Sequence, residues 1–318
     1  MMRAIVAFLL VLSNVAVAQT YPNRPLRVIV PQPPGGGFDL VARTLSEPLG
    51  ALLGQPVIVE NRPGGGTTVG TEIVAKAEAD GYTLLLGASA NLVFSAGLYR
   101  KLPYDPKAHF VPVGLAAGFA YTLVTRNDSP LNSLKAVVDY ARANPGKLTY
   151  ASAGNGSGQH ICAALVWHLA GVSLTHVPYK GAQAAYQDLI PGRVDLFFDA
   201  SATARGQVEG GRVKPLVVSG PARLPYHPNV PTLRETGVLD FEVESWVGFF
   251  VRTGTPEPVV ARLRAEFDRV VSSPEIAASF AKRGARPIRL SVPETEALVA
   301  RDIEKWTGLI RSAGISVD

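Results

Sequence analysis

The chain has 318 residues, of which 47% are hydrophobic and 18% are charged, so it is globular and long enough for two hydrophobic cores. Its formal net charge of +5 comes from scattered Lys and Arg residues, which excludes a nucleic-acid-binding arm and a polybasic membrane segment. The single cysteine, Cys162, excludes an internal disulfide. Its apolar surroundings predict a small buried side chain and not a nucleophile.

The first eighteen residues have the pattern of an export signal. Arg3 gives a positive start, residues 4–12 are almost all apolar, and Ala16-Val17-Ala18 is an A-x-A cleavage site. The apolar run is too short to span a bilayer. We therefore expect residues 1–18 to be a signal peptide that is removed after Ala18, leaving a soluble chain that begins at Gln19.

Residues 28–39 predict a strand, a loop rich in proline and glycine, and the start of a helix that runs towards Gly50. Asp39 is a candidate N-cap, because a short carboxylate accepts hydrogen bonds from the first turn of a helix. Glycines 35–37 leave backbone N–H groups beside the helix start, where an anion can bind. A tight turn without a ligand explains the same residues equally well.

The strand–loop–helix pattern recurs twice in the next fifty residues. A short strand at 55–61 leads into Pro63-Gly64-Gly65-Gly66 and a helix, and a strand at 82–87 leads into Ala88-Ser89-Ala90-Asn91. Repetition of this unit predicts a parallel sheet with right-handed crossovers. Ligands of such sheets bind at the carboxyl ends of the strands, which is where all three small-residue loops fall.

The strand–loop–helix pattern recurs in the second half of the chain. Strands are expected at 111–116, 121–125, 148–152, 175–179, 194–199 and 215–219, and a helix capped by Ser133 at 134–143. The strand at 148–152 runs into the small-residue loop 153–158 and a helix. A long strand at 242–251 then precedes helices at 256–272, 274–283 and 293–312, each of them starting at a proline.

These elements predict an α/β protein of two lobes, each a mostly parallel sheet flanked by helices, joined by two crossover strands. The crossings are expected near residues 117–121 and 241–246. Lobe 1 would then comprise residues 19–118 plus 246–318, and lobe 2 residues 119–245.

Enzymatic and cofactor sites find little support in the motifs. Neither glycine-rich loop completes G-x-G-x-x-G, no Walker loop is present, and the residue two before Ser157 is Asn155, so the G-x-S-x-G elbow is absent. The five histidines form no H-x-x-x-H pair, so we expect neither a metal site nor a cofactor. Ser157 and His160 lie three apart and leave an exported Ser/His hydrolase as an alternative. Packing of His160 against the loop is the favoured interpretation.

The remaining candidates are small, neutral loops that face one another from two lobes and suit a carboxylate. They lie at residues 34–39, 88–91, 154–157 and 179–181, with Asp199 beside them. Charge-assisted bonds from N–H and O–H groups contribute about 1.5–3 kcal/mol each when water is excluded. Lys180 is either a cation for the ligand or a solvated lysine after a turn. Asp199 either accepts an ammonium or hydroxyl group or caps a helix.

Across nearly the whole mature chain, these residues in this order resemble the extracytoplasmic receptors of tripartite tricarboxylate transporters, also called Bug receptors. The matching segments are Tyr21-Pro22, Val30-Pro31-Gln32-Pro33-Pro34-Gly35-Gly36-Gly37-Phe38-Asp39, Ala42-Arg43, Val59-Glu60-Asn61-Arg62-Pro63-Gly64-Gly65-Gly66, Asp80-Gly81-Tyr82-Thr83-Leu84-Leu85, Leu102-Pro103-Tyr104-Asp105-Pro106, Ser152-Ala153-Gly154-Asn155-Gly156-Ser157-Gly158-Gln159-His160, Val177-Pro178-Tyr179-Lys180-Gly181 and Val230-Pro231-Thr232-Leu233. Each motif is weak alone, but the ordered set is specific.

The resemblance implies a non-enzymatic, two-lobed periplasmic binding protein that closes on a small solute. It implies a ligand carboxylate held by backbone and hydroxyl groups with the help of ordered water. The solutes of the family that it resembles are dicarboxylates, tricarboxylates, acidic amino acids or aromatic acids. The site residues that it indicates are Pro34, Gly35, Phe38, Asp39, Ser89 and Asn91 in lobe 1 and Gly154, Gly156, Ser157, His160, Tyr179, Lys180, Gly181 and Asp199 in lobe 2.

Two residues depart from the family pattern. Gln32 stands where the family often has an aromatic or small residue, and Phe38 stands where small polar residues are common, so we expect a reshaped pocket. The expected partners are the membrane subunits of a transporter or the periplasmic domain of a sensor, with no nucleic acid and a monomeric chain. An orphan ligand-presenting protein that serves only a sensor is the second alternative.

Overall fold

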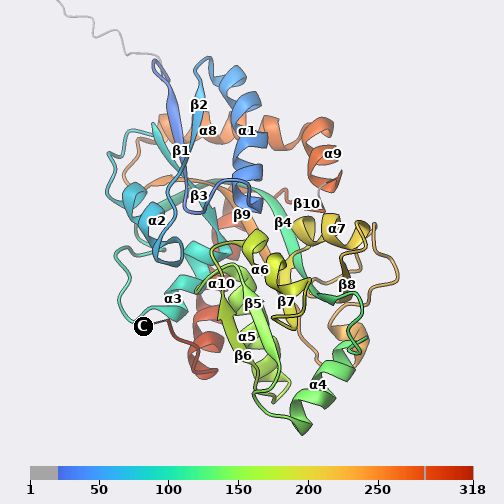
Figure 1. Cartoon of the computed structure of the whole chain (residues 1–318). Helices are drawn as coiled ribbons and strands as arrows, with labels where there is room; N and C mark the ends of the chain where they lie inside the picture. Colours follow the sequence, from blue (N-terminus) through green and yellow to red (C-terminus); the bar gives the residue numbers. More distant parts are fainter. Residues whose placement is uncertain (1–20, 283, 318) are drawn as a thin grey trace, which may run out of the picture.

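The structure is a computed structural model that describes residues 21–282 and 284–317 (Figure 1). The expected signal peptide, residues 1–18, lies outside the described residues. Within the described ranges, no helix is both long enough and apolar enough to cross a membrane.

The strands form one continuous sheet whose central strand, β4 (Phe110–Arg126), belongs to both halves of the molecule (Figure 1). Its first half pairs with β9 (Glu244–Arg252), and its second half pairs with β7 (Leu196–Ala200) and β8 (Val213–Val218). All three pairings are antiparallel. We call the half of the molecule around β9 lobe 1 and the half around β7 lobe 2.

Lobe 1 contains the three parallel strands that the repeated strand–loop–helix pattern predicts. Its strand order is β2-β1-β3-β9-β4, with β10 on the other side of β4. The first strand reads LRVIV and is buried at four of its five positions, as expected for a parallel strand covered on both faces. These elements are β1 (Leu26–Val30), α1 (Gly37–Leu53), β2 (Val57–Asn61), η1 (Gly65–Thr67), α2 (Thr68–Ala75), β3 (Thr83–Ala88), the π-helix η2 (Ser89–Phe94), α3 (Ser95–Leu98) and β10 (Arg286–Pro287).

Lobe 2 repeats the arrangement with β7, β5 and β6 in parallel and helices on both faces. The expected cap of its first helix is confirmed, since the Ser133 side chain accepts a hydrogen bond from the Ala136 N–H. Its further elements are α4 (Leu134–Ala143), β5 (Thr149–Ser152), α5 (Gly158–Leu169), β6 (Thr175–Pro178), α6 (Ala182–Leu189), α7 (Ser201–Glu209) and η3 (Arg234–Thr236).

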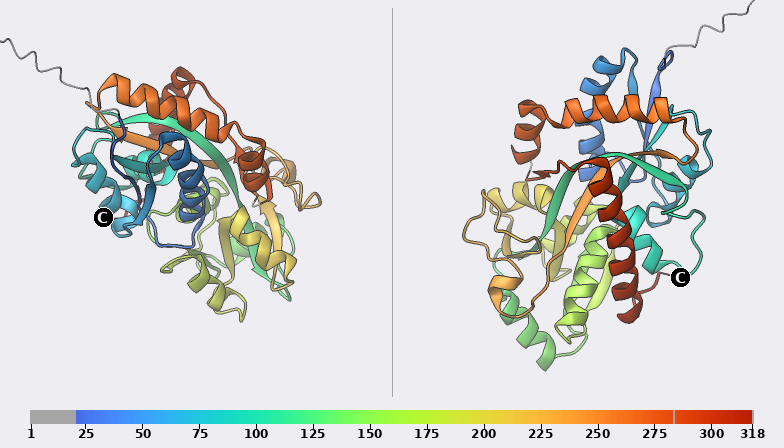
Figure 2. Two further views of the ribbon diagram at one scale, coloured as in Figure 1. Left: turned by 90° about the horizontal axis from the view of Figure 1, so that it is seen from above. Right: turned by 180° about the vertical axis from the view of Figure 1, so that it is seen from behind.

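The C-terminal helices pack on elements of lobe 1. α8 (Glu257–Val271) packs on α1 and β4, and α9 (Pro274–Lys282) packs on α1. α10 (Val292–Ser312) packs on η2 and α3 and runs down the back of the molecule (Figure 2). One apolar core extends through both lobes across β4, with a smaller cluster under α6 and α7.

The crossing between the lobes differs from the sequence prediction. Separate strands were expected at 111–116 and 121–125, but one strand runs through both segments. Register shifts after Pro112 and after Leu115 absorb the extra residues as bulges, so the small residues between them do not end the strand. Pairing of β4 with β9 ends at Ala120, and its pairing with β7 begins at Tyr121. The exact lobe boundaries, 118/119 and 245/246, stay a prediction.

Candidate functional site

A cleft of about 710 Å³ lies between the two lobes, and loops from both lobes line it. Its walls are the strand-to-helix connections that follow β1 and β2 in lobe 1 and β5, β6 and β7 in lobe 2. These connections lie at the carboxyl ends of parallel strands, where ligands of α/β proteins bind. Of the predicted site residues, those that line the cleft are Pro34, Gly35, Gly154, Ser157, Lys180 and Gly181.

The electrostatics of the cleft favour an anion. Lys180 is exposed and is the only charged side chain among the lining residues. The helices α1, α5 and α6 begin at the cleft, and the amino end of a helix carries partial positive charge and free N–H groups. The cleft therefore has donors and one cation for a carboxylate.

Asp39 holds the loop between β1 and α1 in place by hydrogen bonding. The carboxylate of Asp39 accepts hydrogen bonds from the Gly35 N–H at 2.9 Å and from Arg43 Nε at 3.0 Å. Burial opposes ionisation, but these hydrogen bonds hold the pKa of Asp39 below its usual value. The expectation that Asp39 is the N-cap is wrong, because Gly36 occupies that position and the carboxylate turns back to the loop.

Three further predicted residues of lobe 1 are buried and do not line the cleft. The ring of Phe38 packs against Phe119 with centroids 5.9 Å apart. Ser89 Oγ accepts a hydrogen bond from the Trp246 N–H, and Asn91 Oδ1 accepts one from the Ala88 N–H. Ser89 and Asn91 thus lie at the carboxyl end of β3, while Phe38 packs on β4.

The loop after β2 lines the cleft although its residues were not among the predicted site residues. Thr67 has φ of 92°, a left-handed backbone that is rare for a β-branched residue, and its buried Oγ1 has no hydrogen-bond partner among the described residues. Gly66 lies against lobe 2, since a Cβ at Gly66 would be 2.7 Å from the Asn155 carbonyl oxygen. The repeated Pro-Gly-Gly-Gly motif is the sequence signal that could have identified this loop.

In lobe 2, the loop between β5 and α5 is held by two stacked histidines. The His160 and His176 rings lie 4.1 Å apart and nearly parallel. His160 Nδ1 accepts a hydrogen bond from the Gly156 N–H, and His176 Nε2 is 2.7 Å from Ser152 Oγ. Burial lowers the pKa of His160 to about 3 and that of His176 to about 4, so both rings are neutral at pH 7.

Ser157 and His160 do not form a nucleophile–base pair by hydrogen bonding. Ser157 Oγ accepts a hydrogen bond from the backbone N–H of His160 and caps α5. The His160 ring instead bonds the loop at Gly156, which is the packing role favoured from the sequence. The Gly156 backbone has φ of 77° and is buried beside Gly66.

The remaining predicted residues lie along β6 and β7. Tyr179 is partly buried, and its hydroxyl donates to Asp188 at 3.0 Å, while Gly181 precedes α6 with φ of 102°. Asp199 is completely buried, and its Oδ1 accepts a hydrogen bond from the Ala200 N–H at the start of α7. Gln32, which the sequence indicated as reshaping the pocket, lines the cleft, and so do Gln159 and Gln183, which sequence reasoning missed. No local motif distinguishes the latter two glutamines from surface residues.

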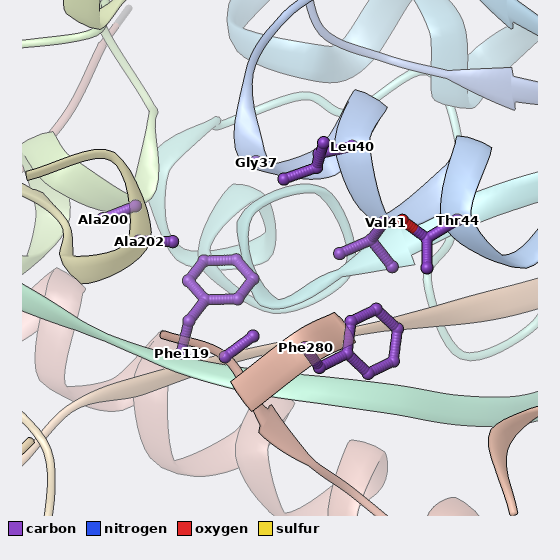
Figure 3. A pocket seen from close by; sticks show the side chains of 9 residues that line it. Gly37, Leu40, Val41, Thr44, Phe119, Ala200, Ala202 and Phe280 are labelled. Carbon is purple, nitrogen blue, oxygen red and sulfur yellow. The ribbon is translucent and has the colours of Figure 1, made fainter. Parts of the chain in front are cut away.

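A second, smaller void adjoins the cleft, with which it shares Gly37 and Ala200 (Figure 3). Its lining is almost entirely apolar and includes Leu40, Phe119 and Phe280. Its volume of about 20 Å³ is comparable to one water-sized sphere. The void is therefore too small to hold a ligand, and the larger cleft is the candidate site.

Residues 41–315 match the tripartite tricarboxylate transporter family receptor. The chain belongs to this family. The receptor is similar in sequence and fold to the periplasmic binding protein BugD, with 34% identity, a TM-score of 0.86, and coverage of 93% of this chain and 100% of BugD. The family expected from the ordered motifs is confirmed, as is the two-lobed periplasmic binding protein fold.

Two similar solved structures contain a carboxylate ligand. A protein of R. palustris with adipate has 31% identity and a TM-score of 0.88, with 93% of this chain and 100% of that chain covered. MatC of Rhodopseudomonas palustris with bound malate has 33% identity and a TM-score of 0.85, with 91% and 100% covered. The family is one of solute-binding receptors and not of enzymes.

Proposed function

We propose that this receptor captures a small carboxylate-bearing metabolite in the cleft between its lobes. The observation that supports the proposal most directly is a cleft whose lining has no acidic side chain and one basic side chain, Lys180, and at which α1, α5 and α6 begin. Adipate and malate in similar proteins support the same ligand class. The carboxylate would be held by N–H groups in the first turns of α1, α5 and α6, with Ser157 close by.

A thermal-shift screen over organic acids tests the ligand class. A ligand that binds only the folded chain stabilises it by about 2.7 kcal/mol at a concentration of one hundred times Kd, which raises the melting temperature by several degrees. The screen pairs each acid with its uncharged amide. Stabilisation by an unrelated solute class and by no acid would overturn the proposal.

Lys180→Met tests the cation of the cleft. We expect about tenfold weaker binding of the acid found in the screen, because an exposed charge-assisted contact is lost. Lys147→Met is the matched control, since Lys147 is also an exposed lysine of lobe 2 but does not line the cleft. Equal affinities of the two variants would show that Lys180 is only a solvated side chain.

We further infer that the receptor acts in the periplasm, after removal of residues 1–18, and delivers its ligand to transporter membrane subunits or to a sensor. Membership of the receptor family supports this role. Mass spectrometry of the periplasmic fraction should find a chain that begins at Gln19. If the receptor serves a transporter, deletion of the gene should abolish uptake of the acid. If it serves a sensor, deletion should abolish the transcriptional response to the acid and leave uptake unchanged.

A further inference from the structure

Asp199 is a buried carboxylate without a cationic partner. Its Oδ2 accepts a hydrogen bond from the Tyr186 hydroxyl at 2.9 Å, and its Oδ1 accepts bonds from the Ala200 N–H at 2.8 Å and from Gln159 Nε2 at 3.4 Å. All three partners in the described part of the chain are neutral donors. Of these, Gln159 connects the buried carboxylate to the cleft, because its side chain is half-buried and lines the cleft.

The bond to Asp199 fixes the orientation of the Gln159 amide. An ionised carboxylate only accepts hydrogen bonds, so the amide must turn its NH₂ group to Asp199. The other polar atom of the amide is Oε1, which receives no hydrogen bond from the described residues. Oε1 is an acceptor, and a ligand group in contact with it must be a donor.

We propose that Gln159, oriented by Asp199, is a specificity residue that selects carboxylates carrying a hydroxyl, amino or amide donor. The proposal rests on the proposed carboxylate-binding function and adds the second recognition element of the ligand. The carboxylate would lie towards Lys180 and the glycine loops. A group without a donor leaves the Gln159 oxygen unsatisfied, and a second carboxylate in the same place is repelled by that oxygen and by the negative charge of Asp199 behind it.

Matched acids that differ by one donor test the proposal in titration calorimetry. The probes are malate with succinate, glutamate with glutarate, and 4-hydroxybenzoate with benzoate. At pH 8, we expect the donor-bearing member of at least one pair to bind at least about fivefold more tightly, since a hydrogen bond of this type contributes about 1 kcal/mol. Equal affinities within every pair would overturn the proposal.

Substitution of two glutamines that line the cleft tests whether the donor preference depends on Gln159 in particular. Gln159→Met should reduce the preference to less than about twofold, because methionine presents no amide oxygen to a ligand donor. Gln183→Met is the matched control, because Gln183 lines the cleft but has no bond to Asp199, and it should keep the preference. A preference that survives in Gln159→Met contradicts the assignment.

Asp199→Asn tests whether Asp199 acts by positioning the amide. An asparagine can donate to Gln159 as well as accept, so the amide is free to present either atom and the preference should fall. The variant's melting temperature reports separately on folding. If Asp199→Asn keeps the wild-type preference, the carboxylate does not position the amide and that part of the proposal fails.

The pH dependence of the preference gives a second readout. Burial raises the pKa of Asp199 to about 7, so below this pH a protonated Asp199 can donate to Oε1 and release the NH₂ group. The titratable groups that face it are the phenols of Tyr186 on α6 and Tyr121 on β4, and burial raises the pKa of both, so neither ionises in this range. The preference should therefore weaken between pH 8 and pH 6, and a constant ratio would argue against the mechanism.

The outcomes distinguish this proposal from the proposed function. Binding of acids without any donor preference removes the role of Gln159 and leaves the carboxylate receptor intact. If the thermal-shift screen finds no acid that binds, both proposals fail together.

Discussion

Thr67 combines two features that cost stability and lie at the cleft. Its backbone is left-handed, and its buried hydroxyl has no partner among the described residues. For a non-glycine residue, the left-handed conformation costs roughly 1–2 kcal/mol. Such strain persists where the surrounding structure imposes it, which is common at ligand sites.

Replacement of Thr67 by glycine should therefore leave the free energy of unfolding unchanged or raise it by up to about 1 kcal/mol, because relief of strain offsets the lost contacts. Urea unfolding measures this. Thr68→Gly is the matched control, since Thr68 has helical φ of −68° and bonds Gly65, and glycine there should cost about 1 kcal/mol. A loss above 1 kcal/mol in Thr67→Gly would contradict the strain argument.

At the scale of elements, the loop after β2 meets the loop after β5 across the cleft. Glycine at position 66 permits this contact, because a Cβ would strike the Tyr99 hydroxyl and lie 2.7 Å from the Asn155 carbonyl oxygen. Tyr99 in turn donates to Gly65 at 2.7 Å and braces the loop. The approach of the two lobes thus depends on a missing side chain.

We predict that Gly66→Ala weakens binding of the acid by at least about tenfold, because the added methyl group holds the lobes apart. Small-angle scattering should show a smaller ligand-induced compaction than in wild type. Gly171→Ala controls for backbone strain, since Gly171 has a similar φ of 64° but open space around its Cβ position. Gly171→Ala should lose about 1 kcal/mol of stability from strain alone, and Gly66→Ala should lose more, because its Cβ also meets Tyr99 and Asn155. Equal affinities would show that the loops need not approach closely.

For the whole molecule, buried titratable groups set the pH dependence of stability. His160 and His176 have folded pKa values below 6.5, so unfolding takes up protons as the pH falls below 6.5 and stability decreases. Asp199 has a raised folded pKa and binds a proton that the unfolded chain releases between about pH 4 and 7, so it opposes this trend.

Between pH 6.5 and 5, we expect His160→Asn to lose less stability on acidification than wild type, and Asp199→Asn to lose more. A full proton of difference changes the slope by about 1.4 kcal/mol per pH unit. Asparagine at 160 keeps an acceptor for the Gly156 N–H and so isolates the titration from the hydrogen bond. Denaturant unfolding at several pH values measures the slopes, and identical slopes in all three proteins would refute the assignment.

The sequence by itself determined the elements that depend on local patterning. The apolar run of β1, the Ser133 cap and the glycine-rich loops after strands follow from rules that act within a few residues. The same loops, placed at strand ends by parallel-sheet topology, located six of the residues that line the cleft. The ordered motifs also identified the family, which the match over residues 41–315 confirms.

Only the tertiary structure decided which side chains face the cleft and which support it. The Asp39 carboxylate turns back to its own loop, the His160 ring on α5 stacks on a ring 4.1 Å away on β6, and β4 continues through a segment where two separate strands were expected. Gln159 donates a hydrogen bond to Asp199, forty residues later in the chain. These outcomes depend on contacts between distant segments, where burial and available partners override what a residue's neighbours in sequence favour.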